Sequence, residues 1–174
     1  MAVTYMRKAE AKDLDAVWQV ITEARAKLKA DGSPQWQDGH PDRQQIETDL
    51  KQGVGCVLMV GQEVAGYAAL VHSPEPTYQQ IYHGTWNNDS ASYMVIHRIA
   101  IRSKFSGQHL STLFMAFLIS NSVQRGVKNI RFDTFRLNHA LQHHGAKFAF
   151  QKRGDIKVID KVDPWRFAYE LNLE

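Results

Sequence analysis

The stretch Ile99-Ala-Ile-Arg-Ser-Lys-Phe-Ser-Gly-Gln-His-Leu-Ser-Thr-Leu-Phe114 decides the fold, because a buried strand ends in it and a helix begins. Residues 93–101, YMVIHRIAI, are almost all apolar and rich in β-branched side chains. This composition predicts a central strand that is buried on both faces. Residues 107–125 then repeat apolar side chains at helical spacing up to Gly126, which predicts a helix ended by that glycine.

The loop between this strand and this helix has the features of an anion site. The first turn of a helix has unpaired N–H groups and the positive end of the helix dipole, so a loop that leads into it commonly binds phosphate. Gly107 would let the backbone approach a ligand closely. An ordinary strand-to-helix connection with a convenient glycine explains the same residues, so the stretch alone leaves both interpretations open.

The patterns on either side of this stretch complete the order β-α-α-β-β-β-α-β-α-β-β. We expect one α/β (α+β) domain over residues 1–174, with a mixed sheet and helices on its faces. The polar, turn-rich residues 73–92 predict a long loop, of a kind that often acts as a lid. The other predicted strands are 3–7, 56–60, 64–71, 128–132, 148–152 and 165–173, and the other predicted helices are 13–29, 41–50 and 138–147.

Composition narrows the partners and the compartment. The net charge is only +3 and the Lys and Arg residues are scattered, which argues against a nucleic-acid partner. The single cysteine, Cys56, excludes an intramolecular disulfide and fits a reducing cytoplasm. The N-terminus has no apolar signal core, and the longest apolar run, Leu113–Ile119, is far short of the ~20 residues of a membrane span. We therefore expect a cytoplasmic protein without a membrane partner.

The 99–114 stretch resembles motif A of the GNAT superfamily of acyl-CoA-dependent N-acetyltransferases, commonly written V-x-P-x-x-(R/Q)-G-x-G-(I/L)-(G/A). The residues that match this motif are Ile101, Phe105, Gly107 and Leu110. The residues that depart from it are Ser106 in place of Arg or Gln, His109 in place of the second Gly, and Ser111 in place of Gly or Ala.

Further segments resemble one bacterial branch of small GNAT proteins. They are a Q-W-x-x-G-Y-P loop at 35–41, an H-R-I-A-V strand at 97–101, a D-T-x-x-x-N-x-A-M-Q…G-F…G-x-I pattern across 133–156 with Ala149 in place of Gly, and a closing R-x-A-Y-E at 166–170. This resemblance covers most of the chain. It implies a mixed, splayed sheet flanked by helices on both faces, with pantetheine between the fourth and fifth strands.

The resemblance also implies a reaction, the transfer of an acetyl group from acetyl-CoA to a primary amine of a small molecule or peptide. Acetyl-CoA or coenzyme A would be a co-substrate. The residues implied to bind it are Ile99, Ala100 and Ile101 for pantetheine, Ser106, Gly107, Gln108, His109, Leu110, Ser111 and Thr112 for the pyrophosphate, and Asn138 for the pantetheine arm. Asn138 can equally be a simple helix N-cap.

Three residues are candidates for the acceptor side. His97 stands where many family members carry Glu, and it is either the general base or a hydrogen-bonded core histidine. Arg98 is expected to pair with a buried carboxylate or with an acidic group of the substrate. Trp36 is either a wall of the acceptor pocket or a cap on the core.

The position of the family's usual general acid, a tyrosine, is occupied by Gly145. We expect the neighbouring His144 to face another way, because adjacent helix positions do not share a face. The alternative function is therefore a catalytically weak or inactive CoA-binding sensor of the same fold. His139 and His143 have helical i, i+4 spacing but no third ligand, so no metal is expected. The edge strands of the sheet allow a homodimer.

Overall fold

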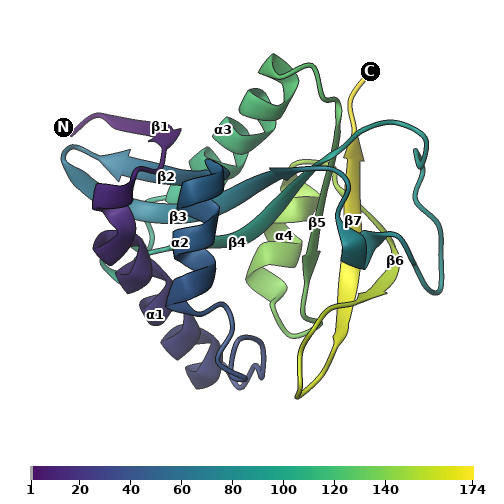
Figure 1. Ribbon diagram of the computed structural model, residues 1–174, viewed down its shortest axis with the longest axis horizontal. Helices are drawn as coiled ribbons and strands as arrows, with labels where there is room; N and C mark the ends of the chain where they lie inside the picture. Colours follow the sequence, from purple (N-terminus) through teal and green to yellow (C-terminus); the bar gives the residue numbers. More distant parts are fainter. Residues whose placement is uncertain (1) are drawn as a thin grey trace.

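Side chains alternate along the strands and so build two apolar layers, one on each face of the sheet. In the computed structural model, which describes residues 2–174, β2 (Gly55–Val60) directs Leu58 to one face and Val57 to the other. Leu58 belongs to the apolar cluster of α3 (Leu110–Gln124), and Val57 to that of α1 (Leu14–Ala30) and α2 (Arg43–Gln52). The predicted mixed sheet with helices on both faces is confirmed (Figure 1).

The remaining elements follow the predicted order along the chain. They are β1 (Thr4–Lys8), β3 (Glu63–His72), β4 (Met94–Ile101), β5 (Asn129–Thr134), α4 (His139–Lys147), β6 (Gln151–Lys157) and β7 (Trp165–Asn172). Within the described residues these six strands and β2 form a seven-stranded sheet in the order β1-β2-β3-β4-β5-β7-β6. Only the β4–β5 pair is parallel; the other neighbours are antiparallel.

Strand β4 contains a bulge where it passes β3. Tyr67 pairs with Ala100 and Ala69 pairs with His97, so two steps along β3 face three steps along β4. Arg98, inside this interval, has φ 55°, a left-handed conformation that a regular strand does not contain. A bulge of one extra residue bends its strand and increases the local twist.

Strands β4 and β5 stop pairing just before this bulge. Their parallel pairing is limited to Met94 with Ile130 and Val95 with Arg131. Figure 1 shows β2, β3 and β4 running at a steep angle to β5 and β7. The rest of the β5-facing edge of β4 therefore has no strand partner, which is the splay that the resemblance implied.

Three predicted boundaries were wrong by three residues or more, and one of them is the end of β6, which lies at Lys157 rather than at residue 152. Helix α3 begins at Leu110 rather than at Gly107, because Gly107 (φ 78°) and His109 (φ 57°) are left-handed and cannot continue a helix. The strand predicted from residue 148 begins at Gln151, because the left-handed Ala149 (φ 61°) ends the turn that follows α4.

The segment between β3 and β4, predicted as a loop and a candidate lid, contributes to the core. It contains a short 3₁₀ turn, Pro76–Tyr78. Tyr78 and Trp86 are only 1% and 7% exposed, and the Trp86 indole donates to the Tyr78 carbonyl (3.0 Å). The guanidinium of buried Arg131 lies 4.0 Å from the Trp86 ring centroid and 3.9 Å from that of Tyr93. Such a segment is anchored rather than free to open as a whole.

Candidate functional site

The space between the separating strands leads into a cavity of about 920 Å³. Its walls come from β4, the first turn of α3, the start of α4, the connection between α1 and α2, and the turn after β3. Cavities of this size are typical of small-molecule and cofactor sites. The elements that the sequence singled out therefore meet around one space.

The unpaired edge of β4 forms one wall. Ile99, Ala100 and Ile101 all line the cavity. Along a strand edge without a partner, backbone N–H and C=O groups point outward instead of joining a ladder. This wall can therefore offer main-chain hydrogen bonds to an elongated ligand, in keeping with the predicted pantetheine contacts.

The first turn of α3 forms a second wall, which we call the α3 end of the cavity; it is lined by Ser106, Gly107, His109, Leu110 and Ser111. Gln108 and Thr112 are not among the lining residues. A Cβ atom placed on Gly107 would meet no other atom within 4 Å, so the backbone there is open. The backbone amides of Thr112 and Leu113 both donate to the His109 carbonyl. The amides before Thr112 lie ahead of the first hydrogen bonds of the helix, so the helix itself offers them no carbonyl partner. This end of the cavity has the amide groups and the dipole orientation of an anion site.

Asn138 caps α4 and also lines the cavity. Its Oδ1 accepts a hydrogen bond from the Leu141 amide (3.2 Å), so the predicted N-cap is confirmed. Its Nδ2 donates to Gln35 Oε1 (3.4 Å), which connects α4 to the loop after α1. The predicted contact with a pantetheine arm stays a prediction, from a residue on the correct wall.

His97 faces the cavity and is held by a carboxylate that sequence reasoning missed. Its Nε2 lies 3.0 Å from Glu75 Oε2, and the two side chains are 18% and 16% exposed. Glu75 also accepts from the amide (3.2 Å) and the hydroxyl (2.9 Å) of Thr77. Burial alone would raise the pKa of Glu75, but the hydrogen bond and charge of His97 and the bonds from Thr77 outweigh it and lower the pKa to about 2. An imidazole fixed by an ionised carboxylate can accept a proton from a ligand.

Arg98 is paired with a buried carboxylate. Its Nε and Nη2 donate to the two oxygens of Asp49 at 2.9 and 2.8 Å. Asp49, 2% exposed, also accepts from the Tyr67 hydroxyl (2.8 Å) and from Gln45 Nε2 (3.0 Å). Burial and then the charge of Asp49 raise the pKa of Tyr67, which keeps its hydroxyl a donor. Of the two predicted partners of Arg98, the structure contains the buried carboxylate.

The residue beside the usual tyrosine position does face the cavity, so the expectation for His144 was wrong. A Cβ on Gly145 would lie 2.7 Å from the Phe132 ring, so this position packs directly on β5. The neighbouring His144 then turns toward α3, where its Nε2 lies 2.9 Å from Ser111 Oγ. Burial, and then the positive charge of Lys147, lowers the pKa of His144.

Trp36 packs against the apolar cluster of α1 and α2, as its interpretation as a cap on the core predicts, and it also lines the cavity; its role as a wall of the acceptor pocket stays a prediction. Among residues 2–174, no group of three His, Cys, Asp or Glu side chains gathers in a way that could hold a metal ion. No helix in the described part of the chain is both long enough and apolar enough to cross a membrane.

Residues 18–150 match the model of the acetyltransferase (GNAT) family. A GNAT-family acetyltransferase from Streptococcus agalactiae has a similar structure, with 34% identity, coverage of 98% of this chain and 96% of that chain, and a TM-score of 0.89. The ribosomal-protein-S18-alanine N-acetyltransferase from Escherichia coli is 14% identical over 99% and 95% of the two chains (TM-score 0.68). The NatC complex bound to Gag peptide and CoA is 10% identical over 98% and 99% (TM-score 0.64). The last two similarities show the fold alone. No curated protein matches the chain.

Proposed function

Because the chain belongs to the GNAT acetyltransferase family, we propose that it transfers an acetyl group from acetyl-CoA to a primary amine of a small molecule or peptide. One observation carries the proposal: a single cavity contains both an anion site at the start of α3 and a histidine held by a carboxylate. The first feature fits the pyrophosphate of CoA, and the second fits a base for the amine.

The co-substrate supplies an acetyl group activated as a thioester. In the proposal, the amides around Gly107 and the dipole of α3 bind the pyrophosphate. The free edge of β4 at Ile99 and Ile101 binds the pantetheine arm through main-chain groups. An N–H of the same edge stabilises the negative charge that develops on the thioester oxygen. The similar NatC complex contains CoA and a peptide, which is consistent with both ligand classes.

His97 is the proposed general base. An amine attacks only in its neutral form, and the ionised Glu75 orients the imidazole and stabilises its protonated form once the proton has moved. A base in such a role contributes typically 10²–10⁴-fold to the rate. Glu75 is a positioning residue, since its bonds go to His97 and Thr77.

The alternative, a CoA-binding protein with little or no turnover, is favoured by one observation. Gly145 has no side chain to donate a proton, and its contact with Phe132 leaves no room for one. The hydroxyl of Ser111 and the imidazole of His144, the residue next to Gly145, lie together at the α3 end of the cavity. Turnover would then depend on proton donation by this pair, or on departure of the CoA thiolate without a proton donor.

The test measures free thiol release from acetyl-CoA with a panel of small amines and peptides, for wild type and His97→Ala. We expect amine-dependent release in wild type and a loss of about 100-fold in the variant. The rise in melting temperature caused by CoA should be the same for both proteins. A CoA-induced shift without amine-dependent release would support the alternative, and the absence of any shift at millimolar CoA would reject CoA binding altogether.

A further inference from the structure

The basic side chains that line the cavity away from its α3 end each have a carboxylate beside them. Within residues 2–174, each of them has a carboxylate partner within ion-pair distance. The pairs are Lys27 with Asp31, His40 with Asp38, His97 with Glu75, Arg98 with Asp49, Arg102 with Glu23, and Arg166 with Asp160. An acidic substrate group would therefore meet, in this part of the cavity, only basic side chains that already have a carboxylate beside them.

Asp133 is the opposite case, a cavity-lining carboxylate without a cation. It stands next to last in β5, where this strand diverges from β4, and it forms no ion pair in the part of the chain that the structure describes. Its one protein hydrogen bond comes from the Tyr78 hydroxyl (2.8 Å). A carboxylate has about four lone-pair sites, so most of its capacity remains for a ligand.

Tyr78 fixes the position of the Asp133 carboxylate. Burial first, and then the charge of Asp133, raises the pKa of Tyr78, so its hydroxyl keeps its proton and donates it to the carboxylate. The Tyr78 ring also lies beside His97, with 6.1 Å between ring centroids. Tyr78 therefore contacts the proposed base with its ring and Asp133 with its hydroxyl, which places both groups at the same part of the cavity wall.

We propose that Asp133 binds a second ammonium group of the acceptor, so that the preferred acceptors are amines with another positive charge, such as aliphatic diamines. This inference rests on the proposed function, because it assigns the acceptor to the same cavity. The reacting nitrogen must lose its proton, and a carboxylate paired with it would oppose that loss. The nitrogen that reacts is therefore placed at His97, and the nitrogen that stays protonated at Asp133.

The experiment compares three five-carbon ligands by titration calorimetry on the protein saturated with CoA, where no transfer can occur. They are 1,5-diaminopentane, pentylamine and 5-aminopentanoate. We expect the diamine to bind about 10- to 100-fold more tightly than pentylamine, the usual range for a hydrogen bond between charged groups. We expect the amino acid to bind most weakly, because its carboxylate would meet Asp133.

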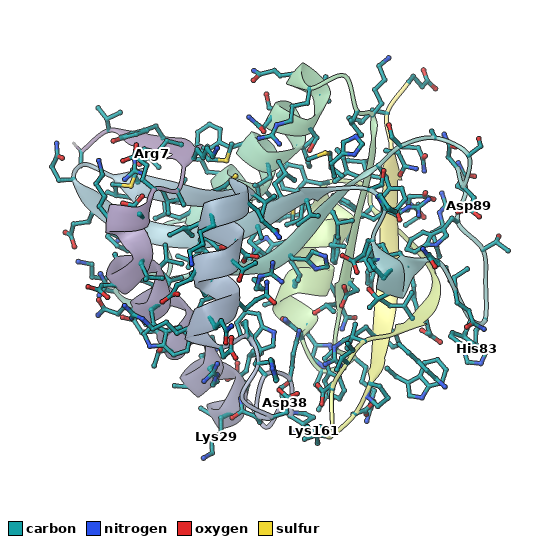
Figure 2. The ribbon with its side chains drawn as sticks, in the orientation of Figure 1. Arg7, Lys29, Asp38, His83, Asp89 and Lys161 are labelled. Carbon is teal, nitrogen blue, oxygen red and sulfur yellow. The ribbon has the colours of Figure 1, made fainter. Side chains whose placement is uncertain are left out.

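Asp133→Asn should remove the preference for the diamine and leave the affinity for pentylamine and CoA unchanged. The amide oxygen of Asn can still accept from the Tyr78 hydroxyl, so the local fold is retained. Asp89→Asn is the matched control, because it makes the same change at a side chain that is 80% exposed and outside the cavity lining. Figure 2 labels Asp89 well apart from Asp38, a residue of the cavity wall.

Equal affinity of wild type for the diamine and pentylamine, or no diamine binding, would overturn the proposal even if Asp133→Asn failed to fold. Unchanged diamine affinity in a folded Asp133→Asn protein would do the same. Selective diamine binding without thiol release from acetyl-CoA would keep the assignment of Asp133 and reject turnover. Release with pentylamine but without a preference for the diamine would keep the acetyltransferase and reject the assignment.

Discussion

The substitution Asp49→Asn tests whether the buried ion pair with Arg98 maintains the bulge in β4 and, through it, the cofactor wall. Asp49 receives two bonds from Arg98, one from Tyr67 and one from Gln45, and it joins α2 to β3 and β4. Asparagine has the same size, but it has no charge and replaces one acceptor oxygen by a donor. Because each carboxylate oxygen accepts two of the four bonds, the change removes the acceptor of two of them and leaves the guanidinium without a counter-ion.

The expected cost follows from burial. Removing one partner of a buried pair typically costs 3–5 kcal/mol, because the other charge is left uncompensated. Asp49 is 2% exposed at its side chain, but that of Arg98 is 18% exposed and can recover some hydration. We therefore expect the lower limit, about 3 kcal/mol of unfolding free energy. With a urea m-value of about 2 kcal/mol/M, the midpoint should fall by about 1.5 M.

The assay pairs urea unfolding with CoA titration, and Asp13→Asn is the control. Asp13 accepts two bonds from Arg7, and its hydrogen bond with Arg7 lowers its pKa, yet it does not line the cavity. Both variants should lose stability. Only Asp49→Asn should also weaken CoA binding, by about tenfold, because only it releases the left-handed Arg98 next to Ile99. An unchanged midpoint, or equal CoA affinity in the two variants, would refute the reasoning.

Two other predictions concern the backbone and pH. Gly107→Val should abolish detectable CoA binding. The control is Gly126→Val, which places a side chain at the same φ of 78° outside the cavity lining; it should cost similar stability and leave CoA affinity unchanged. Equal CoA affinities of the two variants would mean that Gly107 is only a connector. The folded-state pKa of Glu75, about 2, lies below its ordinary value of 4.5, so its stabilising contribution is complete above pH 4.5 and is lost as the pH falls toward 2. Glu75→Gln should flatten this part of the stability profile in acid unfolding, and an unaltered slope would contradict the pairing with His97.

Local patterns predicted the strand, loop and helix between residues 93 and 125 because each depends on nearby residues. The continuous apolar run requires burial on both faces, and Gly126 ends the helix. The exact start of α3 was missed, since a left-handed His109 has no marker in the sequence. The splay of the sheet and the site residues were predicted from the family resemblance, because no periodic pattern in the sequence indicates them.

The partners of the predicted side chains could not be found in this way, because they are distant in sequence. Glu75 lies 22 residues from His97, in a segment that is polar enough to pass for a plain loop. Asp49 lies 49 residues from Arg98, on a helix in which most residues are polar, so its burial has no marker in the sequence. The orientation of His144 depends on the contact between Gly145 and Phe132, and this contact cannot be deduced from helical spacing alone.

The bulge connects these separate features into one physical argument. The extra residue of β4 lies between His97 and Ala100, and we expect the pair with Asp49 to stabilise the left-handed backbone of Arg98 in this interval. The bulge lies directly after the last pair of β4 with β5, the edge at Ile99–Ile101 has no partner on β5, and Asp133 lines the same cavity from β5. His97 precedes the bulge and therefore stands where the two strands begin to part. A buried ion pair outside the reaction thus sets the distance between the cofactor wall, the proposed base and the proposed acceptor contact.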